Sequence, residues 1–193
     1  MIAPEAGCSI GGRFEKNFRR PRAVLAFFLA IFGFCSVGAA QKPSVSDSDN
    51  LLGPVSAKSD LYPANADAKR EINEALQTAL NEKKRVLLIF GANWCYDCHV
   101  LDHALHDGDA GKLVSEKFLL VHVDIGEGAR NGELTSKYKI PLDKGVPAIA
   151  ILDANGRLLY SSGDGEFEAA RKMMKKDLVA FLRRWQPESE AIR

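Results

Sequence analysis

The chain has 193 residues, of which 46% are hydrophobic and 26% are charged, a composition typical of one folded domain with additional segments. The formal net charge at pH 7 is only +1. The sequence therefore lacks the strong positive charge of most nucleic-acid-binding proteins, and we expect no nucleic-acid partner. It also contains no internal repeat, which excludes a repeat architecture.

Residues 1–40 have the pattern of a targeting segment. The basic stretch "RRPR" ends at Arg22, the apolar run "AVLAFFLAIFGFCSVGAA" fills residues 23–40, and small residues precede Gln41. This order predicts a secretory signal peptide that is cleaved near residue 39 or 40. The alternative is an uncleaved membrane anchor, because about 18 apolar residues are at the lower limit for spanning a bilayer. Both interpretations place the remainder in the periplasm or another extracytoplasmic compartment.

A linker and the start of a domain follow. Residues 41–66 are rich in Ser, Asp and Pro and have no hydrophobic period, which predicts a flexible linker. We expect the folded domain to cover residues 67–187, with residues 188–193 as a tail. In residues 67–85 the apolar side chains recur at helical spacing, so this stretch predicts a first amphipathic helix.

The rest of the domain alternates between strand and helix patterns. Short apolar runs predict the strands, a hairpin turn is indicated at Asn155 and Gly156, and amphipathic periodicity predicts the helices. In chain order we expect a strand at 86–90, a helix at 95–105, a strand at 117–125, a helix at 132–139, strands at 147–153 and 157–161, and a helix at 166–185. This order predicts an α/β fold with a central mixed sheet of about four strands flanked by helices. We expect parallel pairing between the alternating strands and an antiparallel edge from the last hairpin.

The motif "GANWCYDCH" at residues 91–99 carries the most reactive side chains. Removal of a signal peptide leaves Cys95 and Cys98 as the only thiols. In an oxidising compartment such a pair forms its own disulfide, or is kept reduced or ligated. A disulfide that closes so short a loop constrains the unfolded chain very little, so we expect redox chemistry and not structural stabilisation.

Two other interpretations of the motif involve a cofactor. With His99 the string reads Cys-x-x-Cys-His, which is the attachment sequence of c-type haem. Small cytochromes are mostly helical, whereas this domain alternates strands and helices, so haem attachment is the less favoured alternative. His99, His103 and His106 share one helix face and lie near Cys98, but zinc ligands usually come from separated elements. We therefore interpret the three histidines as solvated, and we expect neither a metal nor another cofactor.

The motif and a later proline together resemble the thioredoxin superfamily. The residues that carry the resemblance are "NWCYDC" after a buried strand and "GVPA" before another, and the likeness is greatest to exported bacterial thioredoxin-like proteins. The resemblance spans residues 67–187. It implies the thioredoxin fold, a redox disulfide between Cys95 and Cys98, and a cis peptide bond before Pro147. The chain departs from thioredoxins at Ile89, where they carry a buried acid that accepts a proton from the second cysteine.

The resemblance and the expected helix start assign a role to each site residue. Cys95 is expected at the N-terminus of a helix, whose dipole stabilises a thiolate by up to about 2 kcal/mol. Cys95 is therefore the attacking thiol, and Cys98, one turn further along, is the resolving thiol. Trp94 is expected to pack beside the disulfide and cover it, or to be an ordinary core aromatic. Val146 and Pro147 are expected to face the dithiol, with the Val146 backbone pairing with an extended substrate segment.

These residues predict an exported thiol-disulfide oxidoreductase that exchanges disulfides with protein substrates. Asp97 is either a solvated acid at the helix start, which we favour, or a carboxylate that disfavours the nearby thiolate. The second interpretation underlies the hypothesis that the protein is more reductant than oxidant. We expect a monomer whose electrons come from a membrane-bound donor, because no reducing pool exists outside the cytoplasm. The alternative is a non-catalytic thioredoxin-fold binding module, although many such domains lose one cysteine and this chain keeps both Cys95 and Cys98.

Overall fold

The computed structural model describes residues 52–58 and 60–188. The predicted signal peptide or anchor at residues 1–40, the first part of the predicted linker and the end of the predicted tail lie outside the described residues. Within the described part of the chain, no helix combines the length and the hydrophobicity that crossing a membrane requires.

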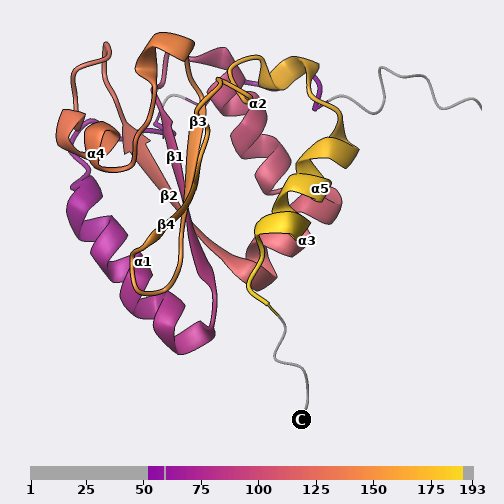
Figure 1. Ribbon diagram of the computed structural model, residues 1–193. Coiled ribbons are helices and arrows are strands. Elements are labelled where there is room, and N and C mark those ends of the chain that lie inside the picture. The colour runs from indigo at the N-terminus through magenta and orange to yellow at the C-terminus, as the bar shows by residue number, and fades with distance from the viewer. Residues whose placement is uncertain (1–51, 59, 189–193) are drawn as a thin grey trace, which may run out of the picture. The chain divides into compact units, whose positions relative to one another are not determined.

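A mixed sheet of four strands forms the centre of the domain (Figure 1). The strands are β1 (Arg85–Gly91), β2 (Phe118–Asp124), β3 (Ala148–Leu152) and β4 (Leu158–Ser161), and their order in the sheet is β2-β1-β3-β4. β1 pairs with β2 in parallel, whereas β3 is antiparallel to both β1 and β4. The predicted fold class and the predicted mixed sheet of about four strands flanked by helices are confirmed.

The direction of β3 differs from the prediction. We expected it to run parallel to the earlier strands, but it runs antiparallel to β1. The connection from β2 to β3 contains the helix α4 (Gly132–Lys137), which has 6 residues. Such a helix is about 9 Å long and cannot carry the chain back along a strand of about 23 Å. β3 therefore starts at the end of the sheet where the carboxyl end of β2 lies. The motif follows the carboxyl end of β1 at this same end of the sheet.

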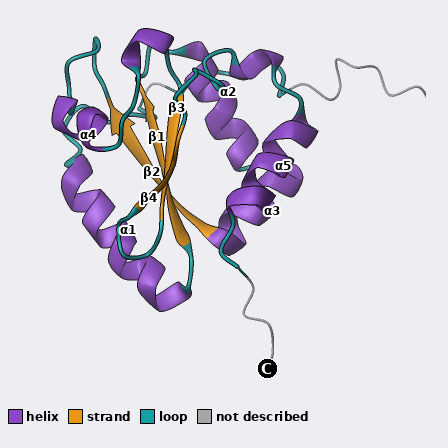
Figure 2. Ribbon diagram, viewed as in Figure 1, coloured by secondary structure: helices purple, strands orange, loops and turns teal. Residues whose placement is uncertain are grey.

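Helices cover both faces of the sheet (Figure 2). α1 (Ala68–Glu82) and α4 lie on one face, and α2 (Tyr96–Leu105), α3 (Gly108–Lys117) and α5 (Lys175–Trp185) lie on the other. Two short 3-10 helices, η2 (Leu142–Lys144) and η3 (Ala170–Lys172), lie in the connections. The two faces bury separate apolar clusters.

β1 contributes side chains to both clusters, as β2 and β3 also do. Its alternate side chains point to opposite faces of the sheet. Leu88 and Phe90 pack with α1, whereas Leu87 and Ile89 pack with α2, α3 and α5. All four are 0% exposed, which explains why β1 is a continuous apolar run.

Two helix boundaries differ from the predictions. The helix α3 was not expected. A break at residues 106 and 107 separates it from α2, and α3 begins at Gly108, whose φ is +54°. The last helix begins at Lys175 and not at residue 166. Before it, the buried ring of Phe167 packs on Phe181 with ring centroids 5.0 Å apart, and this contact holds residues 166–169 in turns that a continuous helix would not allow.

Part of the predicted linker packs on the domain. The Leu52 N–H donates to the Met173 carbonyl at 3.1 Å, and the Val55 N–H donates to the Tyr96 hydroxyl at 3.1 Å. Tyr62 is only 1% exposed. The ordered contacts of the domain thus begin upstream of the predicted boundary at residue 67, and one of them reaches the cysteines.

Candidate active site

The two cysteines lie where β1 passes into α2. Cys95 is the N-cap residue of α2, and its Sγ accepts a hydrogen bond from the Cys98 N–H at 3.2 Å. The sulfurs form a disulfide, with the two Cα atoms 5.3 Å apart. Cys95 keeps 5% of its surface exposed and Cys98 none, so a partner can approach the pair only from the side of Cys95. A helix N-cap offers backbone N–H groups to a negative charge, and this position favours a thiolate at Cys95.

Val146 lies opposite Cys95, just before β3. Its carbonyl oxygen is 3.4 Å from the Cys95 Sγ, and its side chain packs against the buried cluster that contains both cysteines. The peptide bond between Val146 and Pro147 is cis, as the resemblance implies. The structure thus brings together the four residues Cys95, Cys98, Val146 and Pro147, although about 50 residues separate the two halves of this site.

Trp94 lies at the surface of the site. Its side chain is 57% exposed, which rules out the alternative of a core aromatic. The indole Nε1–H donates to the Gly126 carbonyl at 2.9 Å, in the loop after β2. Tyr96, on the other side of Cys95, is 37% exposed. Two aromatic side chains therefore flank Cys95 and remain accessible to a partner.

Asp97 is not the solvated acid that we favoured. It is 8% exposed, and its Oδ1 accepts a hydrogen bond from the Arg171 N–H at 2.8 Å. The Arg171 Nη1 lies 3.1 Å from Oδ2. The carboxylate holds η3 against the start of α2, and the guanidinium compensates part of the negative charge beside the dithiol.

His99 is buried and therefore also differs from the prediction of a solvated histidine. It is 3% exposed, its Nε2 donates to the Asn93 carbonyl at 2.8 Å, and its Nδ1 accepts from the Lys58 N–H at 3.2 Å. Both ring nitrogens are used within the protein, whereas an axial haem ligand needs a free one, so His99 does not fit haem attachment. His103 and His106 are exposed as expected. No group of three or more ligand side chains within the described residues is arranged to hold a metal ion.

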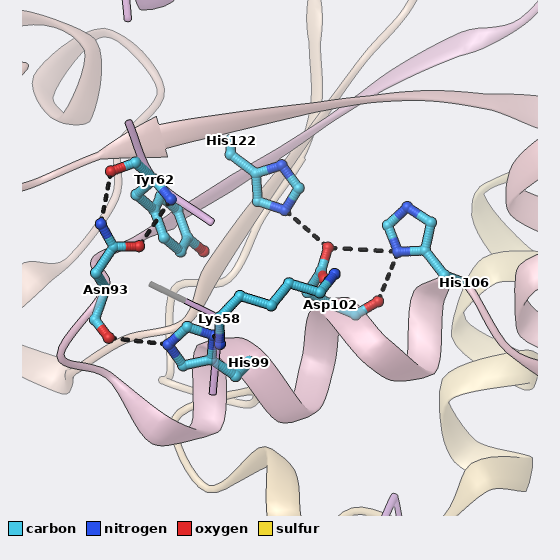
Figure 3. Close-up of polar contacts among 7 residues, drawn as sticks. All are labelled: Lys58, Tyr62, Asn93, His99, Asp102, His106 and His122. Atoms are coloured by element: carbon cyan, nitrogen blue, oxygen red, sulfur yellow. Dashed lines mark hydrogen bonds and ion pairs between the residues drawn. The ribbon is translucent and has the colours of Figure 1, made fainter. Parts of the chain in front are cut away.

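Tyr62 also belongs to the site, although no sequence pattern indicated it. Its side chain forms a small buried cluster with Cys95 and Cys98. The Asn93 side chain holds it there by two hydrogen bonds to the Tyr62 backbone (Figure 3). Asn93 Oδ1 accepts from the Tyr62 N–H at 2.9 Å, and Nδ2 donates to the Tyr62 carbonyl at 2.8 Å. The residue two positions before Cys95 thus fixes the upstream segment against the disulfide.

Replacing Asn93 with alanine is expected to lower the free energy of unfolding by about 2 kcal/mol, because two backbone groups of Tyr62 lose their partners. Denaturant unfolding of the oxidised protein measures this. The matched control is Asn73→Ala on the exposed surface of α1, which is expected to change stability little. Equal stabilities of the two variants would contradict the role assigned to Asn93.

A cluster of ionisable side chains lies next to Tyr62, around Asp102 of α2 (Figure 3). The Asp102 side chain is 1% exposed. Lys58 Nζ donates to its Oδ2 at 2.7 Å, while His122 Nε2 of β2 and His106 Nδ1 lie 3.1 and 3.3 Å from Oδ1. Burial alone would raise the pKa of the Asp102 carboxyl, but the contacts with His122 and Lys58 and the charge of His106 outweigh it and hold the pKa well below its usual range. Asp102 is therefore a buried carboxylate that pairs with the Lys58 ammonium and contacts two histidine rings.

The four-stranded mixed sheet and the helix-capping disulfide define the thioredoxin class of fold. A family model described as thioredoxin-like matches residues 67–154. The crystal structure of a disulphide isomerase from Xylella fastidiosa Temecula1 is 34% identical in sequence, with a TM-score of 0.60, and the match covers 64% of this chain and 95% of that protein. The chain belongs to the thioredoxin superfamily, and within it to the thiol-disulfide oxidoreductases.

Longer relatives match as well. The thiol:disulfide interchange protein DsbD of Pseudomonas fluorescens is 27% identical over 143 residues, which are 72% of this chain and 22% of that protein. DsbD of Pseudomonas sp. (strain JR1 / K1) is 27% identical over 181 residues, which are 86% of this chain and 28% of that protein. The chain thus spans about a quarter of the length of these relatives.

Proposed function

We propose that this protein exchanges disulfides with protein substrates through Cys95 and Cys98. The observation that carries the proposal is the position of Cys95, which caps α2, receives the Cys98 N–H at 3.2 Å and is the more accessible of the two sulfurs. A thiolate stabilised in this way is the nucleophile that disulfide exchange requires. Cys98 is 0% exposed and reacts only with Cys95.

In the reducing direction the exchange has two steps. The Cys95 thiolate attacks one sulfur of a substrate disulfide, which forms a mixed disulfide and releases the other substrate sulfur as a thiolate. Cys98 then loses its proton and attacks Cys95, the mixed disulfide breaks, and the second substrate sulfur leaves. Two electrons and two protons pass from the dithiol to the substrate, and the protein is left with its Cys95–Cys98 disulfide.

The surface around Cys95 suits an extended polypeptide. The Val146 carbonyl is 3.4 Å from the Cys95 Sγ and is the backbone group nearest to a bound substrate strand in our proposal. The exposed rings of Trp94 and Tyr96, which precede and follow Cys95 in the sequence, offer apolar contacts to a substrate. We propose that Val146 aligns the substrate backbone, that Pro147 shapes this edge, and that Trp94 contacts substrate side chains.

We further propose that the protein acts outside the cytoplasm, as a monomer and as a reductant. The signal-like pattern of residues 1–40 supports the compartment, and the thiol:disulfide interchange proteins among its relatives support the chemistry. The carboxylate of Asp97 supports the direction because it disfavours the thiolate form, although Arg171 compensates part of its charge. Each reaction oxidises such a reductant to its disulfide, which must be reduced again, so we propose a membrane-bound electron donor.

Two measurements on residues 41–193 test the proposal. Equilibration with reduced and oxidised glutathione is expected to give a reversible two-electron couple with a potential below about −200 mV. The reduced protein is expected to reduce the disulfides of insulin. A potential near about −120 mV, as in strongly oxidising enzymes, would overturn the direction, and absence of a reversible couple would overturn the function itself.

A further inference from the structure

We propose that the hydroxyl of Tyr62 is a further catalytic group, which donates a hydrogen bond to the sulfur of Cys98 whenever the disulfide is open. The inference rests on the proposed function and assigns a donor to the resolving step. Tyr62 lies outside the motif and comes from the segment before α1, so neither the motif nor its spacing indicates this role.

The hydroxyl and the Cys98 sulfur are neighbours above Gly91. A Cβ atom at Gly91 would lie less than 3.0 Å from the Tyr62 hydroxyl oxygen and 2.7 Å from the Cys98 Sγ. Both atoms therefore occupy the space that the missing side chain of Gly91 leaves open. Tyr62 and Cys98 are both buried, so bulk water does not reach either group.

The position of the ring is fixed from two sides. Asn93 binds both backbone polar groups of Tyr62, and the ring packs edge-on against His122, with the ring centroids 5.3 Å apart. A ring held in this way keeps its hydroxyl at Cys98 without losing further conformational freedom during the reaction.

The hydroxyl has no hydrogen-bond partner among the described residues while the disulfide is closed. A buried hydroxyl without a partner costs free energy, and a disulfide sulfur is a poor acceptor. Reduction turns the Cys98 sulfur into a thiol and, during turnover, into a thiolate, which is a much stronger acceptor. The reduced state thus satisfies a donor that the oxidised state leaves unpaired.

Tyr62 acts as a donor and not as a base. Burial raises the pKa of its hydroxyl, and the nearby negative charges of Asp102 and Asp124 raise it further. Tyr62 therefore keeps its proton throughout the reaction. Asp102 already faces Lys58 and His122, and the Tyr62 hydroxyl has no other partner among the described residues, so it is available to donate to Cys98.

The donor assists the second step of the exchange. The proton of Cys98 ends on the departing substrate sulfur, the Cys98 thiolate attacks Cys95, and the bond between Cys95 and the substrate breaks. The electron pair of that bond leaves with the substrate sulfur. The Tyr62 O–H bond stays intact throughout. Its hydrogen bond to Cys98 forms when the disulfide opens and is lost when the disulfide closes.

Tyr62→Phe tests the proposal, because it removes the hydroxyl and keeps the ring. In glutathione buffers the equilibrium is expected to shift about fivefold toward the disulfide, which corresponds to a potential about 20 mV more negative. Resolution of a preformed mixed disulfide is expected to slow about threefold, since the smaller thiolate fraction is partly offset by the higher nucleophilicity of a more basic thiolate. In the Cys98→Ser background, the rate of attack by Cys95 is expected to stay within about twofold of its value with Tyr62 present.

The matched control is Tyr138→Phe, which removes the hydroxyl of another buried tyrosine in the cluster on the opposite face of the sheet. Its potential and resolution rate are expected to equal those of the wild type. Denaturant unfolding adds a second readout, because the oxidised Tyr62→Phe protein should be at least as stable as the wild type and the reduced one less stable.

Three results would overturn the inference. Tyr62→Phe could show the wild-type potential and resolution rate, it could lose stability equally in both redox states, or it could slow attack by Cys95 as much as resolution. In each case the wild type still forms a reversible couple, so the proposed function survives. If the wild type itself forms no reversible couple with glutathione, the function and the inference fall together.

Discussion

Replacing Cys95 with serine is expected to reduce insulin reduction by at least about a thousandfold, to the background rate of the reductant alone. A serine hydroxyl at the cap of α2 does not ionise near neutral pH, so no nucleophile attacks the substrate disulfide. Cys98 cannot replace it, because its sulfur is 0% exposed behind Tyr62 and Cys95. The measurement is the initial rate with the purified variant.

Cys98→Ser is the matched variant and has a different expected outcome. Attack by Cys95 still occurs, but the mixed disulfide is not resolved, so the variant is expected to accumulate covalent complexes that a reducing agent releases. Non-reducing electrophoresis and intact mass report them. If Cys95→Ser kept its biological activity in full, the alternative of a non-catalytic binding module would replace the enzyme.

Much of the fold and the motif follows from local sequence signals. The apolar run of β1 is continuous because its side chains are buried on both faces, and the turn at Asn155 and Gly156 joins β3 to β4 with Gly156 at a φ of +79°. Both signals are local and depend on the physics of a few adjacent residues. The pairing of Cys95 with Cys98 is local in the same sense, because three positions separate the two residues.

The contributions of Tyr62 and Asn93 could not be predicted in this way. The Asn93 side chain meets the Tyr62 backbone across a separation of 31 residues, and the surrounding segment is rich in Ser, Asp and Pro, as a linker is. Two properties of the sequence are compatible with the outcome, a lone large aromatic in the predicted linker and a glycine at the end of β1. Neither specifies the contact, which depends on how α1 returns the chain to the sheet.

The misplaced helix boundaries have a related cause. Residues 166–174 have the composition of a helix, but the burial of Phe167 and the ion pair of Arg171 with Asp97 fix them in another conformation. Arg171 and Asp97 are 74 residues apart in the sequence. Tertiary packing outweighs local propensity there, since helix propensities amount to tenths of a kcal/mol per residue.

The cluster around Asp102 also could not be predicted from the sequence, because its members come from three separate segments. Lys58 precedes α1, Asp102 and His106 frame the end of α2, and His122 lies on β2. The sequence pattern alone is compatible with a solvated Asp102 on an exposed helix face. The structure instead places its carboxylate in the interior, 1% exposed, with the basic groups around it. A carboxylate in that position stabilises the fold only while it carries its charge.

Asp102→Asn is expected to lower the free energy of unfolding at pH 7 by about 3 kcal/mol, because the substitution removes the buried negative charge that pairs with Lys58 and contacts His122. The pKa of Asp102 is lowered in the folded protein from its usual value of 3.8, so its contribution is complete above that pH and is lost as the pH falls below it. Urea unfolding at pH 7, 5 and 3 is therefore expected to show a constant gap between wild type and variant at the two higher pH values and a smaller gap at pH 3. Glu74→Gln, which breaks the exposed pair with Arg70, is the control and is expected to change little at any pH. A gap of the same size at all three pH values would mean that the carboxylate acts through its shape and hydrogen bonds, and not through its charge.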